Sequence, residues 1–169
     1  MTDLEVDWKE LADMVSHKSE KLGQAEDRRT LLQMIYDANS RLDEIEKQLS
    51  SNERGNNLRN VKELIQKKNA VDQEISMLEQ RVTDISERGQ QMMHQGHYDA
   101  QEISRQVDAL IDRFNALQEP LDNRRCVLDD SLKWHQLAFD ADVELQWINE
   151  KRLVAESRSL RQSLTEVSK

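Results

Sequence analysis

The chain has 169 residues, 34% of them charged and 37% hydrophobic, with a formal net charge of −9, so its length fits one domain or one domain plus fragments. Four Gly and one Pro are too few for the many turns of a β-sandwich or barrel. The acidic balance disfavours nucleic acid or an anionic membrane surface as the main partner, and no apolar run approaches the roughly eighteen residues of a membrane span.

Two polar clusters divide the chain into three predicted helices. Residues 50–57 contain Gly55, which can adopt a positive φ, and asparagines that can cap a helix. Residues 95–99, with Gly96 and His97, form the second cluster. The predicted helices cover residues 3–50, 57–95 and 99–166.

Two local features refine the third predicted helix. Asp99 followed by Glu102 has the spacing of a capping box, which predicts the helix start. Pro120 lies inside the helix, where it removes one backbone hydrogen bond and clashes with the carbonyl of Ala116. We expect Pro120 to bend this helix without ending it.

Apolar residues recur every three or four positions along all three predicted helices, which is typical of a coiled coil or slim bundle. Acid–base pairs four residues apart, such as Asp43 with Lys47 and Glu63 with Lys67, indicate the solvated faces. We therefore predict an all-α fold with three-helix packing. The predicted structural core comprises Trp8, Leu42, Ile45, Leu64, Ile75, Leu110, Phe114, Leu117 and Trp147.

The two ends of the chain show an internal repeat. An offset of 106 positions places Trp8 on Phe114 and Leu11 on Leu117, which indicates an array of linked units. In this register the third helix runs into the first helix of a following unit, so we expect a helical linker. The apolar residues of that last stretch form an overhang that can contact a partner, with Leu145, Trp147, Ile148 and Leu153 as its members.

On these features the chain resembles the spectrin repeat family, and spectrins more than their distant relatives. The matching features are the 106-residue period, the segment 51–75 with Gly55, Leu58, Val61, Leu64, Lys67 and Lys68, the pair Gly96-His97, and the runs 113–117 and 145–151. The resemblance implies a left-handed three-helix coiled-coil bundle whose long helices continue into partial neighbouring repeats. It assigns residues 1–31 to the last helix of a preceding repeat, 32–137 to a complete repeat with helices at about 32–50, 57–95 and 99–137, and 138–169 to the first helix of a following repeat.

The complete repeat departs from the family at two aromatic positions. Arg41 occupies the place of the favoured Trp in the first helix, and Phe114 that of the favoured Trp in the third. Trp147 and Trp8 keep these residues in the neighbouring partial repeats. Because a buried large apolar side chain contributes ~1.5–3 kcal/mol, we expect the complete repeat to be less stable than its neighbours.

The resemblance implies a cytoplasmic structural protein at the cell cortex. Its role is then that of a rod segment in a spectrin-like membrane skeleton, an elastic spacer and actin-crosslinking scaffold element. The implied partners are neighbouring spectrin repeats, a partner spectrin subunit and ankyrin. The alternative is a protein-binding module, for ankyrin docking or for subunit dimer or tetramer assembly through the overhanging helices. An unfolded acidic linker is opposed by the ordered apolar stripes.

No motif for catalysis, cofactor binding or metal binding stands out, so we predict no enzyme, no cofactor and no metal site. His94 and His97 are three residues apart, but they straddle a predicted helix end, which favours loop and cap roles. The single Cys126 has no adjacent His for nucleophilic chemistry and cannot form an intrachain disulfide, which favours the cytosol. The basic pairs, Lys67-Lys68 and Arg124-Arg125, are candidate partner or anionic-lipid contacts or simply solubilising positions.

Overall fold

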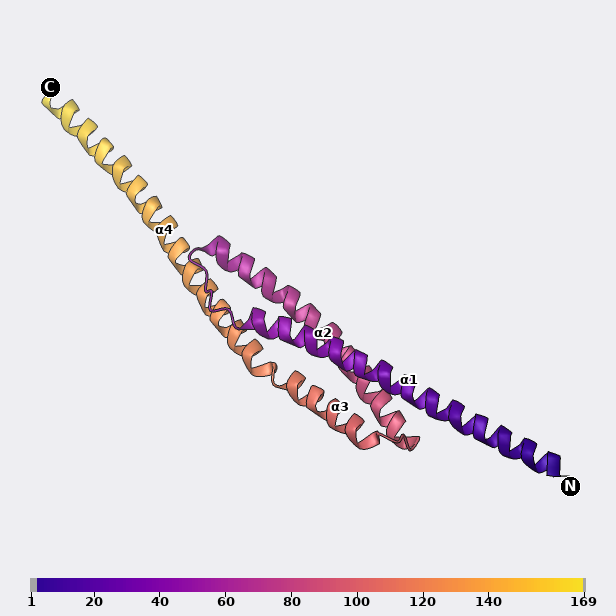
Figure 1. Ribbon diagram of the computed structural model, residues 1–169. Helices are drawn as coiled ribbons and strands as arrows, with labels where there is room; N and C mark the ends of the chain where they lie inside the picture. Colours follow the sequence, from indigo (N-terminus) through magenta and orange to yellow (C-terminus); the bar gives the residue numbers. More distant parts are fainter. Residues whose placement is uncertain (1–2, 169) are drawn as a thin grey trace. The chain divides into compact units, whose positions relative to one another are not determined.

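A computed structural model describes residues 3–168, and the described chain is helical apart from its turns (Figure 1). The helices are α1 (Asp3–Leu49), α2 (Leu58–His94), α3 (Ala100–Asn115) and α4 (Gln118–Val167). The prediction of an all-α fold is confirmed, and α1 and α2 begin and end within one residue of the predicted limits. The long periodic stripes made these limits predictable because only two polar clusters interrupt them.

The contacts divide the chain into two units, which we describe separately. The first unit comprises the chain up to Ser51 together with Asn69–Asp122. The second comprises Asn52–Lys68 and the chain from Asn123 onward. Helices α2 and α4 each contribute residues to both units.

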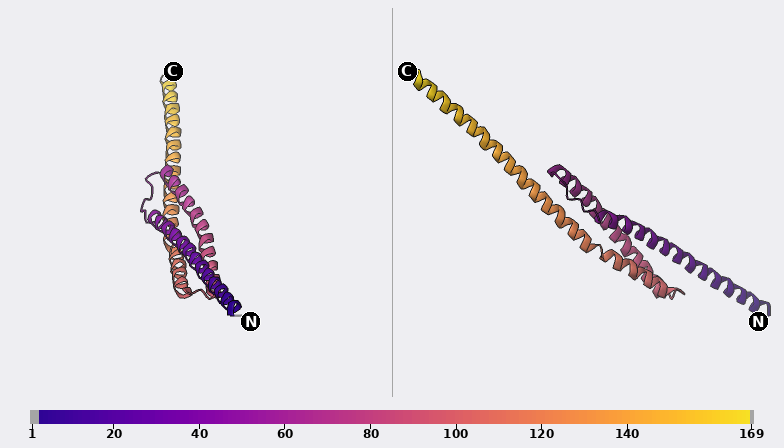
Figure 2. Two further views of the ribbon diagram at one scale, coloured as in Figure 1. Left: turned by 45° about the vertical axis from the view of Figure 1, so that its right-hand side comes forward. Right: turned by 60° about the vertical axis from the view of Figure 1, so that its left-hand side comes forward.

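The first unit is a three-helix bundle. The second half of α1, the part of α2 from Asn69 and helix α3 lie side by side, with α2 antiparallel to the other two (Figures 1 and 2). Apolar side chains at three- and four-residue spacing from all three helices form one core. Its buried members are Leu31, Ile35, Ala38, Leu42, Ile45, Leu49, Val71, Ile75, Leu78, Val82, Ile85, Met92, Ile103, Val107, Leu110, Phe114 and Leu117.

The turn between α2 and α3 is built on Gly96, which has φ of 69°. The N–H of Gly96 donates to the carbonyl of Met93 and that of His97 to the carbonyl of Met92, both at 3.1 Å. This pair of bonds is the Schellman arrangement, which satisfies the last carbonyls of a helix and needs a left-handed residue after it. The chain therefore reverses at the predicted second cluster.

The prediction of a capping box at the start of α3 is wrong. The Asp99 side chain makes no cap hydrogen bond and instead accepts a hydrogen bond from Nε of Arg28 on α1. The bond to Arg28 joins two ionised groups, so it can replace a cap to a backbone N–H. Glu102 accepts hydrogen bonds from Arg105 and Gln106, and these lower the pKa of Glu102 from 4.5 to about 2, with Arg105 the larger cause.

The prediction that Pro120 bends the third helix without ending it is also wrong. Helix α3 ends at Asn115 and α4 begins at Gln118. Between them the N–H of Leu117 donates to the carbonyl of Phe114 at 3.1 Å, a tighter turn than an α-helix makes. The break places Pro120 in the first turn of α4, where a backbone N–H has no partner within the helix and proline is tolerated.

We expect Pro120→Ala to change the free energy of unfolding by less than about 1 kcal/mol. The reason is that proline in a first turn costs little, and its loss mainly frees the unfolded chain by about 0.4–1 kcal/mol. Urea unfolding followed by circular dichroism measures the change. A gain near ~3 kcal/mol, the penalty of a proline inside an unbroken helix, would contradict the position assigned to Pro120.

An ionic cluster connects α3 to α1 in the first unit. Arg113 donates to the carboxylates of Asp43 and Glu46 and to the side-chain oxygen of Asn39. The hydrogen bonds to Glu46 and then Asp43 raise the pKa of Arg113. The predicted pairing of Asp43 with Lys47 along α1 is therefore replaced by a bond across the helices.

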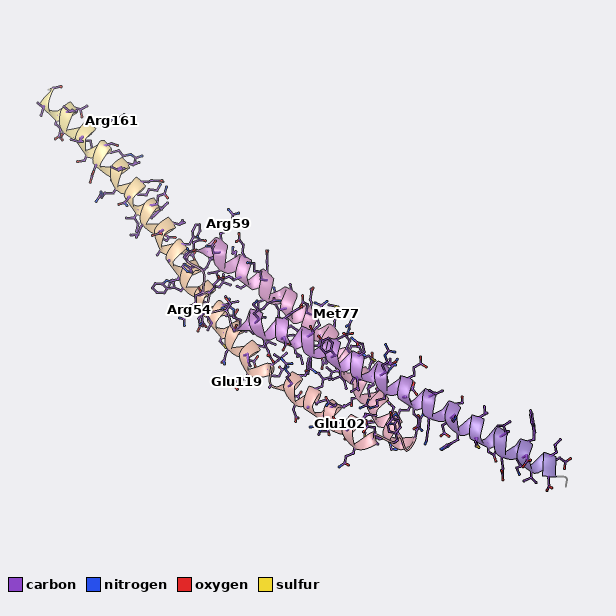
Figure 3. All side chains as sticks on the ribbon, viewed as in Figure 1. Arg54, Arg59, Met77, Glu102, Glu119 and Arg161 are labelled. Atoms are coloured by element: carbon purple, nitrogen blue, oxygen red, sulfur yellow. The ribbon has the colours of Figure 1, made fainter. Side chains whose placement is uncertain are left out.

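The position at which the sequence resemblance would favour a tryptophan borders a hollow in the first unit. Arg41, with a side chain 60% exposed, donates to Glu44 at 2.9 Å. Beside it lies a space of about 180 Å³ between α1 and α2, near the exposed Met77 labelled in Figure 3. The residues that line this space are Arg41, Ile45, Glu74, Met77, Leu78 and Arg81.

We expect Arg41→Trp to raise the free energy of unfolding by about 1 kcal/mol, because the indole can cover Ile45 and Leu78 and bury part of its own apolar area. The exposed Arg41–Glu44 pair that is lost contributes little. Thermal and urea unfolding measure the gain. The matched control is Arg29→Trp on the same helix, at an exposed position that does not line the hollow. An equal gain in both variants would show that the hollow is not the cause.

Candidate interaction surfaces

His97, one of the two histidines considered as metal ligands, has a structural role. His97 is buried, its Nε2 donates to the carbonyl of Gln24 at 2.8 Å, and its Nδ1 accepts the N–H of Asp99 at 3.0 Å. Both ring nitrogens are thus occupied, so His97 has no lone pair left for a metal. Among residues 3–168 no three potential ligands gather, and none of the helices there combines the length and apolar character of a membrane span.

The first surface is the apolar face of the first part of α1. Every residue from 3 to 23 is exposed, and this includes Trp8 at 73%. The sequence prediction that Trp8 is a core residue is therefore wrong for this structure, because no other helix of the described chain covers it. The large apolar residues of this face are Leu4, Trp8, Leu11, Met14, Val15 and Leu22.

The second surface is the apolar face of α4 beyond His135. All residues from 137 to 168 are exposed, along the stretch that carries Arg161 in Figure 3. Trp147, also predicted as core, is 55% exposed, and its ring lies under Nζ of Lys151 at 5.7 Å, a cation–π contact. The predicted overhang residues, Leu145, Trp147, Ile148 and Leu153, are all exposed on this stretch.

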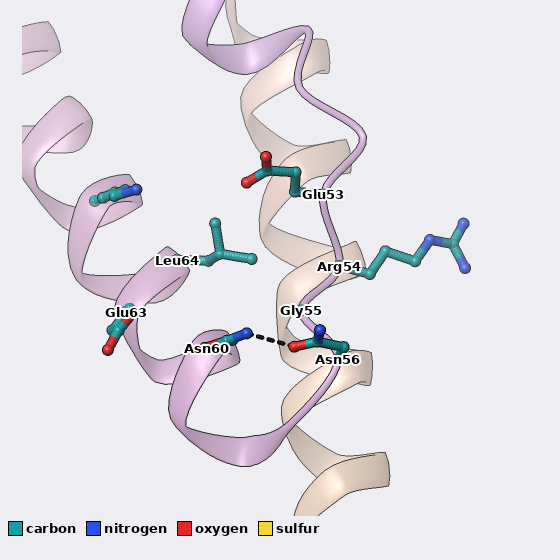
Figure 4. A pocket seen from close by; sticks show the side chains of 8 residues that line it. Glu53, Arg54, Gly55, Asn56, Asn60, Glu63 and Leu64 are labelled. Atoms are coloured by element: carbon teal, nitrogen blue, oxygen red, sulfur yellow. Dashed lines mark hydrogen bonds between the residues drawn. The ribbon is translucent and has the colours of Figure 1, made fainter.

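The remaining predicted core residues lie in two places. Six of them are buried together in the first unit: Leu42, Ile45, Ile75, Leu110, Phe114 and Leu117. Leu64 belongs to the second unit and is only half-buried. It lines an open hollow of about 550 Å³ beside residues 53–56, where Figure 4 shows it facing the loop.

The loop of residues 52–57, which we call the strap, lies along α4 in the second unit (Figure 4). It joins α1 to α2. Asn57 ends it as the N-cap of α2, accepting the N–H of Asn60 at 2.8 Å, and Gly55 has φ of 77°. Both roles are those predicted from the sequence cluster.

Side chains of α4 hold the strap. Arg124 donates to the carbonyl of Glu53 at 2.6 Å and Ser131 to that of Arg54 at 2.6 Å. Nε2 of His135 donates to the carbonyl of Gly55 over a longer 3.4 Å. Sequence reasoning missed this contact because bonds to backbone carbonyls some 71 to 80 positions away leave no residue pattern to detect. Of the predicted basic pair, Arg124 is thus engaged in the structure.

Comparison with known proteins agrees with this architecture. The profile described as "Spectrin repeat" matches residues 26–130, which is more than half of the chain. The chain belongs to the spectrin repeat family. The resemblance predicted from the sequence is therefore confirmed, and the three-helix bundle of the first unit is the family's fold.

Individual spectrins match most of this spectrin repeat chain. "Spectrin alpha chain, erythrocytic 1" of Mus musculus is 29% identical over 157 residues, 93% of this chain and 6% of the relative. "Spectrin beta chain, non-erythrocytic 5" of Homo sapiens is 29% identical over 160 residues, 95% of this chain and 4% of the relative. "Spectrin beta chain" of Drosophila melanogaster is 32% identical over 99 residues, 59% of this chain and 4% of the relative. The chain spans only a small part of each relative's length.

Proposed function

We propose that this chain is a non-enzymatic structural rod segment of a spectrin-like cytoskeletal protein. In this proposal residues 32–137 form one complete repeat, residues 1–31 are the last helix of a preceding repeat, and residues 138–169 are the first helix of a following one. The rod acts as an elastic spacer within an actin-crosslinking scaffold at the cytoplasmic face of the cell cortex. Its direct neighbours are further spectrin repeats and a partner spectrin subunit.

One observation carries this proposal: the same apolar pattern occurs twice, once covered and once uncovered. Trp8 is 73% exposed, whereas Phe114, its equivalent 106 positions later, is 8% exposed. Leu11 is likewise exposed and its equivalent Leu117 buried. Phe114 and Leu117 are covered by α1 and α2, the other two helices of the bundle. The Trp8 face therefore has the pattern of a bundle helix that lacks its two partner helices. A linear array of bundles supplies them.

The exposed faces favour a second function, that of a protein-binding module. An uncovered apolar face of this extent is a typical interaction site. In this alternative the two faces dock ankyrin, or complete a bundle with a helix of a partner subunit to form a dimer or tetramer. The overhang residues Leu145, Trp147, Ile148 and Leu153 are then contact residues.

Sedimentation equilibrium combined with small-angle scattering distinguishes the two functions. For a spacer segment we expect an elongated monomer over the working concentration range. A tight dimer that dissociates in Ile148→Lys, but not in the control Met77→Lys at an exposed site of α2, would favour the assembly role. Binding assays with ankyrin and with partner spectrin subunits then identify the occupant.

A further inference from the structure

Three side chains on one face of α4 contact three successive carbonyls of the strap. Arg124, Ser131 and His135 are separated by seven and four residues, which places them on the same side of an α-helix. Their acceptors, the carbonyls of residues 53, 54 and 55, follow in the same order. The strap is thus bound to α4 over about three helical turns.

We propose that these contacts form a clasp that keeps α4 helical through residues 123–137 and that opens as one unit together with the strap. This inference goes beyond the proposed function, since it concerns the coupling of a loop to a helix inside the second unit. It assigns Arg124, Ser131 and His135 as positioning residues. Closing the clasp fixes the α1–α2 connection and the adjoining part of α4 at the same time.

The contact made by Arg124 makes partial opening of the clasp energetically unfavourable. Arg124 is only 9% exposed, and a buried guanidinium whose acceptor is lost stays desolvated without compensation. Residues 53–55 lie outside every helix, so their carbonyls take no part in a helical ladder and are available to α4. When the strap leaves, the donors of Arg124 and Ser131 lose their acceptors together.

The apolar side of the same unit supports this coupling. Leu128 lies between Arg124 and Ser131 on the same face of α4 and is almost fully buried. Val61, in the first turn of α2 behind the strap, is completely buried, and its side chain would collide with any Cβ on Gly55. The strap therefore has little freedom to shift along α4 while remaining bound.

Hydrogen exchange of the full chain, measured by NMR or mass spectrometry, tests the clasp. For Ser131→Ala we expect amide exchange throughout residues 123–137 and in the strap to quicken together by about fivefold, the effect of one lost hydrogen bond. For Arg124→Met the increase should be larger, about tenfold or more, because a charge-assisted bond is lost.

Two control variants lie on the same helix. Ser157→Ala removes a hydroxyl that donates only to the carbonyl of Val154 three residues earlier, and Arg125→Met removes the exposed neighbour of Arg124. Both should leave exchange in residues 123–137 and in the strap unchanged. The double variant of Arg124 and Ser131 should show about the product of the two single effects, because both bonds are broken in the same opening step.

The clasp is overturned if Ser131→Ala and Arg124→Met quicken exchange only in the strap while residues 123–137 keep the protection of the unaltered chain. It is equally overturned if Ser157→Ala has the same effect as Ser131→Ala. Circular dichroism verifies that each variant retains its helix content, so a general loss of fold is recognised as such. None of these outcomes depends on the role of the chain as a spacer.

Discussion

Leu42→Ala is expected to lower the free energy of unfolding by about 2–5 kcal/mol, among the largest effects of any single truncation in the first unit. Leu42 has an exposed fraction of 0% and belongs to the core that α1 forms with α2 and α3. Removing its isobutyl group loses the transfer free energy of the buried carbons and leaves a cavity that the surrounding helices fill only in part. Urea unfolding followed by circular dichroism at 222 nm, the ordinary helix signal, measures the loss.

The matched control is Leu22→Ala on the same helix. Leu22 is 72% exposed, so its truncation should change the free energy of unfolding by less than about 0.5 kcal/mol. The two variants share helix, residue type and helix propensity, and they differ only in burial. Equal losses in both would mean that the first part of α1 is covered in solution, and that result would contradict the exposed Trp8 face.

The sequence was sufficient for the features that repeat along the chain. Helix limits near Leu49, Leu58 and His94 follow from long apolar stripes interrupted by clusters that contain Gly55 and Gly96. The cap at Asn57 is predictable for the same reason, since asparagine before an apolar run offers its side chain to the first free N–H groups. These features depend only on residues that are close together in the chain, so one sequence is enough to predict them.

Features that depend on distant residues were not predictable in this way. Trp8 has the residue type and spacing of a core position, but burial is decided by whether other helices cover it. The cationic partners of Asp43 and Asp99 are Arg113 and Arg28, some 70 positions away, so the neighbouring sequence does not reveal them. Pro120 indicates a disturbance of the helix, but whether the chain bends or breaks depends on how residues 115–118 pack.

Gly55→Ala is the second substitution with a large expected effect, a loss of about 2–5 kcal/mol. With φ of 77°, Gly55 has a backbone conformation in which an L-residue costs about 1–2 kcal/mol. The added Cβ would also lie 2.6 Å from Cγ2 and 3.0 Å from the backbone nitrogen of Val61. Rotation of the Val61 side chain could relieve only the first of these contacts, because the second is with the backbone of α2.

Gly96→Ala separates the two causes. Gly96 has a similar φ of 69°, but nothing lies within 4 Å of the added Cβ, so only the backbone penalty of about 1–2 kcal/mol applies. The difference between the two variants in urea unfolding therefore measures the close approach of the strap to Val61. If both variants lose the same free energy, that approach does not constrain the chain. If Gly55→Ala quickens hydrogen exchange in residues 123–137 and Gly96→Ala does not, a substitution in the strap has destabilised α4. The clasp predicts this result.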